Sequence, residues 1–290
     1  MTTAGFPDRL PISSPQSIWA APTWIKSFYA KFPLVVLDQE DSITWQTSSN
    51  SSSLWIHPPS SDSHPHHRSW ASNHPISLRT QLLFLSRDPP VEVTFRPWTN
   101  VASAPGGTLP TLHLPKENRL VATDDIRSWL DLNYPLKGKA KEWNGIPSQE
   151  KYDKALAIAQ VVLGPLYRAY LASLPFQSES WHLSFPSPPE LLAGLTTPLP
   201  AAFTGDARHI DKDSVVREGV EAIQALAVFI GDNWALEAEH ATPLDALLVG
   251  YLYPIYSLEE NSILRTALTR HLGLGRYADR VLDLASSNVR

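Results

Sequence analysis

The fold is constrained most by residues 91–130. Residues 91–95 alternate between apolar and polar side chains, which predicts a half-buried strand. After a long loop, Pro110 precedes two short apolar runs, 112–114 and 120–122, which a four-residue turn joins. Two such runs at this spacing predict a β-hairpin. Pro110 then lies at the start of a strand, one of the few positions where a sheet tolerates proline.

A helix is expected directly after this hairpin. Thr123 offers its hydroxyl as an N-cap for the first turn. Asp124 and Asp125 place negative charge on the same turn, where the helix dipole favours it. A strand, a loop with a proline, a hairpin and a capped helix therefore follow one another in this part of the chain.

A strand–helix–strand unit is predicted ahead of the hairpin. Residues 54–57 form a brief strand, and Asn73 is a candidate cap for a helix over 76–86. The crossover implies that the strands on either side of this helix run parallel. Joined to the hairpin, the unit gives a four-stranded mixed sheet with helices on it, spanning 54–135. This is the order of a thioredoxin-like domain, whose loop proline, here Pro110, is usually cis, although a sequence cannot show that.

Residues 148–290 are predicted to be all-helical. Apolar side chains recur at i, i+3, i+4 and i+7 over residues 152–170, as in a long amphipathic helix. Gly164 and Pro165 are expected to kink this helix. A second amphipathic helix follows Asp211.

A capping box opens the most apolar helix of this half. Thr242 is the N-cap, Pro243 the first helical residue and Asp245 the N3 partner, with aspartate in the usual position of glutamate. The helix behind the box is apolar nearly all round, which predicts that it is buried. Asp245 is therefore interpreted as a local structural acid rather than a catalytic one.

Two shorter helices are expected at the end of the chain. Asn261 is a candidate cap for a helix over 263–272. Gly273 and Gly275 are expected to end that helix. The last helix is then predicted over 277–285.

Residues 1–53 are expected to form a proline- and aromatic-rich arm that ends in a polar linker. Trp24 and Phe28 have the spacing of one short amphipathic helix, and Trp19 precedes them. Two interpretations stay open. The arm packs on its own domain, or it docks on a partner through Trp19, Trp24 and Phe28.

Composition and charge exclude several classes of function. The net charge is -5 and no basic cluster is present, which argues against nucleic-acid binding. Without cysteine, the chain has neither disulfides nor a thiol nucleophile. The first residues lack the pattern of a signal peptide, and no apolar run is expected to reach the roughly 18 residues of a spanning helix. With 18% charged residues and 10 tryptophans, part of the surface should be apolar and available to partners.

The run His64, Pro65, His66, His67 is the one stretch considered as a metal site, because imidazole is a common ligand. Pro65 interrupts the spacing, however, and no predicted helix positions the rings. A solvated loop is expected there, and neither a metal nor a cofactor is predicted.

Taken together, a thioredoxin-like domain followed by an all-helical domain resembles the glutathione transferases. Within that superfamily the chain resembles the metaxins. Residues 100–110, NVASAPGGTLP, are similar to a metaxin N-x-x-SPSG-x-LP run, and residues 242–254, TPLDALLVGYLYP, to an LDA-x-x-(F/V)G-(Y/H)-L-x-P run. The resemblance covers about 54–285. The start of the chain, with IKSF at 25–28 and KFPL at 31–34, resembles the fungal metaxin-like subunits of the mitochondrial sorting and assembly machinery (SAM complex). The length of the chain is similar to that of the shorter of these subunits, which has no membrane segment.

This resemblance implies a non-enzymatic subunit that is peripheral to the cytosolic face of the mitochondrial outer membrane. Such a subunit would contact the β-barrel subunit and the second metaxin-like subunit of the SAM complex. It would help to receive the C-terminal β-signal of precursor β-barrel proteins for insertion.

The same fold leaves two alternative functions, a glutathione-dependent transferase and a cytosolic scaffold. A transferase needs a hydroxyl or thiol beside the first strand, for which Ser60 and Ser61 are the nearest candidates. It also needs an acid–serine pair at the start of the helix after the hairpin, where this chain has Ala122–Thr123. Asp124 and Asp125 further disfavour a ligand carboxylate at that helix end. The adaptor is therefore preferred.

Overall fold

The structure is a computed structural model that describes residues 51–60, 64–136, 145–174, 211–231 and 233–289. Residues 50–290 form one compact unit. The three aromatic residues expected to contact a partner, Trp19, Trp24 and Phe28, lie outside the described residues.

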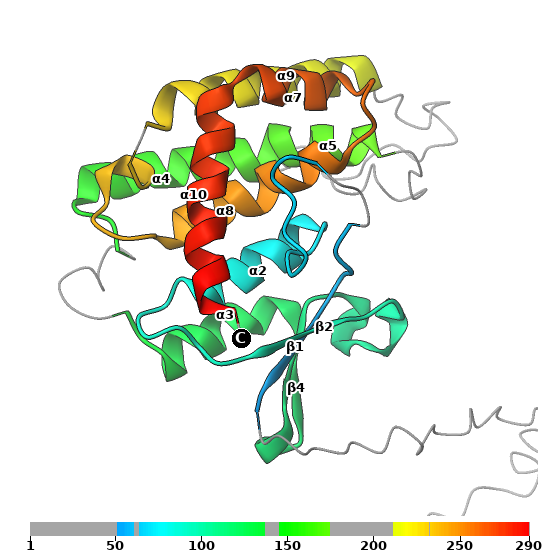
Figure 1. Ribbon diagram of the computed structural model, residues 1–290, viewed down its shortest axis with the longest axis vertical. Coiled ribbons are helices and arrows are strands. Elements are labelled where there is room, and N and C mark those ends of the chain that lie inside the picture. Colours follow the sequence, from blue (N-terminus) through cyan, green and yellow to red (C-terminus); the bar gives the residue numbers. More distant parts are fainter. Residues whose placement is uncertain (1–50, 61–63, 137–144, 175–210, 232, 290) are drawn as a thin grey trace, which may run out of the picture. The chain divides into compact units, whose positions relative to one another are not determined.

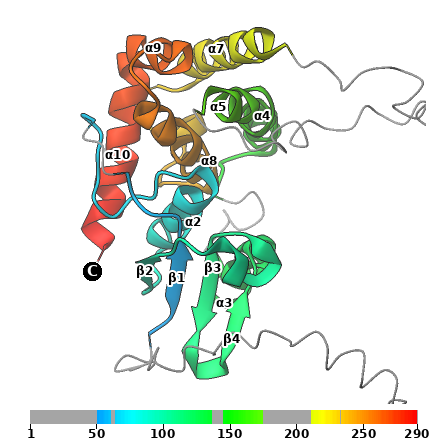
Figure 2. The ribbon, with the colours of Figure 1, turned by 90° about the vertical axis from the view of Figure 1, so that its right-hand side faces the viewer.

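One mixed sheet of four strands lies at one end of this unit (Figures 1 and 2). Strands β1 (Ser53–Ile56) and β2 (Thr94–Pro97) are parallel, whereas β3 (Thr111–Leu114) pairs antiparallel with both β1 and β4 (Arg119–Val121). The order is β2-β1-β3-β4. The helix α2 (Pro75–Leu85) makes the crossover between the parallel strands. The predicted strand–helix–strand unit and hairpin are therefore confirmed.

The two faces of the sheet bury different side chains because successive strand residues point to opposite sides. Leu54 and Ile56 of β1 belong to the main core. Trp55 belongs to a small second cluster with Ala104 and Leu109, and its ring stacks on Trp98 with centroids 4.7 Å apart. The loop before Pro110, which holds short 3-10 turns at Val101–Ser103 and Pro105–Gly107, thus covers the second face of the sheet.

Three boundaries in this part differ from the sequence prediction. The strand expected from residue 91 begins at Thr94, because Val91 still donates its N–H to the carbonyl of Phe84 at 3.1 Å. The helix expected to be capped by Asn73 has His74 at the N-cap. Thr123 is the first residue of α3 (Thr123–Asn133) and not its cap, which is Ala122.

The remaining helices form the second part of the unit, as predicted (Figure 1). Ser148 and Asp211 cap two of them with their side chains. The helices are α4 (Gln149–Val161), α5 (Tyr167–Ser173), α7 (Lys212–Phe229), α8 (Pro243–Leu252), α9 (Ile263–Arg270) and α10 (Leu272–Asn288). Shorter turns lie at Pro115–Glu117, Ala235–Glu237 and Tyr253–Ser257 (η8).

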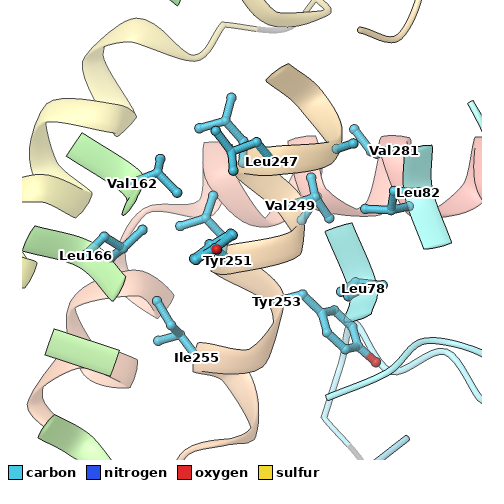
Figure 3. Packing of buried hydrophobic residues seen from close by; sticks show 14 of the residues in the cluster. Leu78, Leu82, Val162, Leu166, Leu247, Val249, Tyr251, Tyr253, Ile255 and Val281 are labelled. Carbon is cyan, nitrogen blue, oxygen red and sulfur yellow. The ribbon is translucent and has the colours of Figure 1, made fainter. Parts of the chain in front are cut away.

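Helix α8 is the centre of the unit. All residues from Leu244 to Leu252 are buried. Figure 3 shows α8 between Leu78 and Leu82 of α2 and Val162 and Leu166 near the junction of α4 and α5. The thioredoxin-like sheet region and the helices therefore share one core, and this arrangement is the glutathione-transferase fold.

The helix from Gln149 to Ser173 has a wide turn at Val162–Leu166, where Pro165 removes a backbone donor. Among the described residues this helix is long and apolar enough to cross a membrane by length and composition alone, with a mean hydropathy of 1.4 and 39% of that window buried. From the sequence we expected no apolar stretch as long as a spanning helix, and by length and mean hydropathy this expectation is wrong. Arg168 interrupts the apolar residues of this helix but lowers the mean hydropathy of the window only a little. In the fold the helix packs against α7 and α8.

Two predictions for the last helices are wrong. Ser262, and not Asn261, caps α9 through its side chain. Gly273 and Gly275 do not end a helix but lie inside α10. A Cβ on Gly275 would lie 3.1 Å from Cε1 of His66, so the glycine allows a close approach of the loop 64–70 to α10.

Candidate functional site

The proline centre is the first place to look for a ligand site, because the chain around it is organised as in glutathione transferases. The Leu109–Pro110 peptide bond is cis, as the resemblance implied. The Thr123 hydroxyl donates to the Pro110 carbonyl at 2.8 Å and lies 3.1 Å from Oγ1 of Thr108. Thr123 therefore ties the start of α3 to the loop, which explains why it does not serve as the N-cap.

The start of α3 carries two exposed carboxylates, Asp124 and Asp125. Side chains of the same sign as a ligand carboxylate oppose its approach to the helix N-terminus, which would otherwise attract it. The N-cap residue Ala122 makes no side-chain hydrogen bond. This helix end thus has a structural role, and it is poorly suited to hold an anion.

The hydroxyl groups near the end of β1 and the start of α2 are buried. Ser72 and Ser77 have no exposed surface. The Ser72 hydroxyl donates to the carbonyl of His57 at 2.7 Å, and Ser77 Oγ lies 3.0 Å from Nδ1 of His57 and accepts from its backbone N–H. Of the two serines considered from the sequence, Ser60 is partly exposed and Ser61 lies outside the described residues.

His57 and His74 form a stacked pair at this junction, with ring centroids 3.9 Å apart. Burial, and then the nearby His57, lower the pKa of His74 to about 3. Burial also lowers the pKa of His57. Both rings are therefore neutral at neutral pH, and they pack with Ser77 between the end of β1 and the start of α2.

The loop 64–70 leaves this junction and packs on α10 and η8 (Figure 2). Its main connections are to two carboxylates of α10. His66 Nδ1 lies 2.9 Å from the carboxylate of Asp279, and Arg68 donates to Asp283 at 2.6 Å. Trp70 adds a hydrogen bond from its indole N–H to the Ser286 hydroxyl at 3.0 Å. The loop is thus held in place instead of being solvated as expected.

The histidines of this loop do not form a metal centre. The ring of His64 lies 6.4 Å from that of His66 and 5.8 Å from that of His67, measured between centroids. His64 instead packs edge-on against Tyr253 at 5.0 Å. Within the described ranges, no group of three or more potential ligands has a geometry that could hold a metal ion.

The capping box of α8 is a buried polar group with several hydrogen bonds. Asp245 is fully buried. Its Oδ2 accepts from the backbone N–H and hydroxyl of Thr242 at 2.7 and 2.6 Å, and its Oδ1 accepts from the N–H of Ala235 and the hydroxyl of Tyr277 at 2.9 and 2.6 Å. Burial, and then the charge of Asp245, raise the pKa of Tyr277 well above its usual value. The predicted capping box is confirmed, and its acid also joins α8 to α10.

A small cavity adjoins this box, between α2, α8 and α10. Its volume is about 10 Å³, close to the minimum that holds one water molecule. Its lining residues include Leu82, Thr242, Asp245 and Val281. A cavity of this size has no room for glutathione or another organic substrate.

The structure brings the four residues of the predicted structural motif together in two separate pairs, Pro110 with Thr123 and Thr242 with Asp245. The buried His57, Ser77 and His74 were missed by sequence reasoning. Tyr277 was also missed as a partner of Asp245. A buried carboxylate needs donors, so a search for a hydroxyl near the chain's end could have found it.

No protein-family model and no curated protein sequence matches the chain. Solved structures with a similar arrangement include a glutathione transferase of Methylobacterium radiotolerans in complex with glutathione sulfonate, at 16% identity, with a TM-score of 0.49, covering 82% of this chain and 94% of that one. The Omega 3C transferase of Trametes versicolor is 8% identical, with a TM-score of 0.46 and coverages of 83% and 93%. A beta-etherase of Sphingobium is 12% identical, with a TM-score of 0.46 and coverages of 82% and 99%.

Proposed function

We propose that this chain is a non-catalytic adaptor, and that it serves as a peripheral subunit of the SAM complex, as its resemblance to the metaxins implies. One observation carries the non-catalytic part. Ser77 of α2 and Ser72, which lies shortly before that helix, are fully buried and bonded to His57. A nucleophile or thiol-binding group must reach its substrate to act, and these two cannot.

The second glutathione-binding position supports the same proposal. Thr123 has its hydroxyl committed to the Pro110 carbonyl, and Asp124 and Asp125 are exposed on the turn where the γ-glutamyl carboxylate would bind. A like-charge contact at about 4 Å costs roughly 4 kcal/mol in a surface-like medium. A cost of that size is enough to abolish millimolar binding.

The metaxin-like run 242–254 supports the more specific part of the proposal. It forms the capping box, α8 and the start of η8, which together make up the centre of the core. In such an adaptor the core would hold the shape of the chain while partners bind its surface. The partners proposed are the β-barrel subunit, the second metaxin-like subunit and precursor β-barrel proteins with their β-signal.

The proposal is tested by fractionation of cells that produce the tagged full-length chain. The chain should sediment with mitochondrial outer membranes, be released at alkaline pH as a peripheral protein, and co-purify with the β-barrel subunit. A variant lacking residues 1–47 should co-purify less while keeping the unfolding midpoint of the full chain. A chain that stays in the cytosol without the barrel subunit would instead be a cytosolic scaffold, and full co-purification of the shortened variant would exclude the arm as a contact.

A further inference from the structure

The helix from Gln149 to Ser173 has an outer face without charge. No charged residue lies between Lys154 and Arg168, and only 39% of the most apolar window of this helix is buried. It packs against α8 on one side, and α7 lies above it (Figure 2). The outward side chains include Leu156 and Leu163, which are 49% and 44% exposed. Because a surface helix normally presents polar residues to water, an apolar face of this kind is typical of an interaction surface.

The residues of this face are arranged symmetrically about Gln160. Leu156 and Gly164 lie four positions before and after it, and Ala157 and Leu163 lie three positions before and after it. Residues at these spacings share one helix face. When a second copy of the helix packs antiparallel with Gln160 opposite Gln160, Leu156 lies level with Gly164 of the other copy. Leu163 then lies level with Ala157 of the other copy. A large side chain meets a small one at each level, which lets two helices pack closely.

Two residues of the face suit a second copy of the chain. A Cβ on Gly164 would meet nothing within 4 Å, so packing within the chain does not require glycine there. Gln160 is exposed, and its amide carries both donors and an acceptor. Two such amides that face each other across a two-fold axis can satisfy one another. A lipid surface would instead leave the amide unpaired, which is unfavourable.

The charges at the two ends of the face are complementary in the antiparallel arrangement. Asp153 lies at its start, and among the described residues it takes part in no ion pair. Arg168 lies at its end, where its side chain is 22% exposed and 3.8 Å from Glu218. An antiparallel pair brings Asp153 of each copy close to Arg168 of the other, whereas a parallel pair would place like charges together.

We propose that the outer face of α4 and of the turn Val162–Leu166 binds a second copy of this chain, in a two-fold symmetric antiparallel helix pair centred on Gln160. Two-fold contacts between identical surfaces are the commonest way in which identical soluble chains pair. Two short helix faces bury less than the roughly 1,600 Å² of a standard interface. The pair should therefore be weak, with a Kd of about 10–100 µM. This inference does not depend on the proposed function, and its test uses the purified chain alone.

Sedimentation velocity of the full chain between about 1 and 500 µM tests the proposal. The chain should change from monomer to dimer within this range, and a monomer throughout would refute the contact. In Gly164→Ala the Kd should rise at least about tenfold, because the new Cβ enters the space of Leu156 from the other copy. The unfolding midpoint of this variant at low concentration should not fall, since the Cβ meets nothing within the chain.

The matched control is Gly273→Ala, at an exposed glycine of α10 where a Cβ also meets nothing within 4 Å. Its Kd should equal that of the parent chain. Equal Kd values for Gly164→Ala and the parent would show that the copies meet at another surface, and this result would also refute the proposal.

A single cysteine locates the contact, because the chain has none of its own. Helices that pack closely have axes roughly 8–10 Å apart, which brings facing Cα atoms within reach of a disulfide. Mild oxidation at about 100 µM should therefore cross-link most of Gln160→Cys into a dimer. Glu221→Cys, at an exposed position of α7, should stay mostly monomeric. Equal cross-linking of both variants would contradict a contact centred on Gln160.

The alternative occupant, a lipid surface, is tested by flotation with neutral phosphatidylcholine vesicles. At about 1 µM, where the chain should be monomeric, we expect it not to float with the vesicles. Flotation that Leu163→Glu abolishes would assign the face to lipid and overturn the proposal.

Discussion

Replacement of Asp245 by alanine is expected to lower the free energy of unfolding by about 3–5 kcal/mol, among the largest effects of a single substitution in this chain. The carboxylate accepts four hydrogen bonds, from the N–H groups of Ala235 and Thr242 and from the hydroxyls of Thr242 and Tyr277. All four donors would lose this acceptor at a site with no exposed surface. Denaturant unfolding of Asp245→Ala should show a lower midpoint with little change in slope.

Two further variants test whether the loss of stability is specific to the buried, four-fold hydrogen-bonded carboxylate of Asp245. Tyr277→Phe removes one of the four donors and should cost only about 1 kcal/mol. Asp283→Ala removes a carboxylate whose side chain is 65% exposed in an ion pair with Arg68, and its effect should stay within about 0.5 kcal/mol. An Asp245→Ala variant as stable as Asp283→Ala would show that the box does not hold α8 in place.

Alanine at Gly219 is expected to lower the free energy of unfolding by about 3 kcal/mol, and alanine at Gly250 by about 1–3 kcal/mol. A Cβ on Gly219 would lie 2.1 Å from the Cβ of Ala169, so α7 and α5 would have to separate. At Gly250 the new atom meets the Arg79 backbone within 2.9 Å. In both cases the obstructing atoms belong to a helix backbone or a short side chain, which cannot rotate away.

The matched control for these two glycines is Gly273→Ala. Gly273 lies inside α10, and a Cβ there would meet nothing within 4 Å. Alanine should therefore leave the stability unchanged or raise it by about 0.5 kcal/mol, through the smaller entropy of the unfolded chain. The comparison is made from denaturant midpoints of the three variants. Equal losses at all three positions would mean that glycine matters here for its backbone freedom and not for helix contact.

Sequence patterns predicted this fold where local and tertiary preferences agree. Pro110 and the hairpin after it were found because strand alternation and turn length point the same way. Thr242 and Asp245 were found because the capping box is a local motif, and the apolar helix behind it is buried on all sides.

The errors arise where a tertiary contact overrides a local rule. Thr123 looked like a cap, but its hydroxyl bonds the carbonyl of Pro110. Gly275 looked like a helix end, but it lies in α10 where His66 comes close. His66 and Asp279 are 213 positions apart in the chain, and no spacing rule connects residues at that separation. The contacts of the loop 64–70 with α10, and the stacked pair of His57 and His74, therefore became visible only in the structure.

The proposal that this chain of glutathione-transferase fold does not bind glutathione is tested most directly by calorimetric titration with glutathione. The transferase of Methylobacterium radiotolerans, solved with glutathione sulfonate, serves as the positive control. With up to about 10 mM ligand, we expect no saturable heat for this chain and saturation for the control. Saturable binding by this chain at or below about 1 mM, with turnover of an electrophile, would contradict the account and support a transferase.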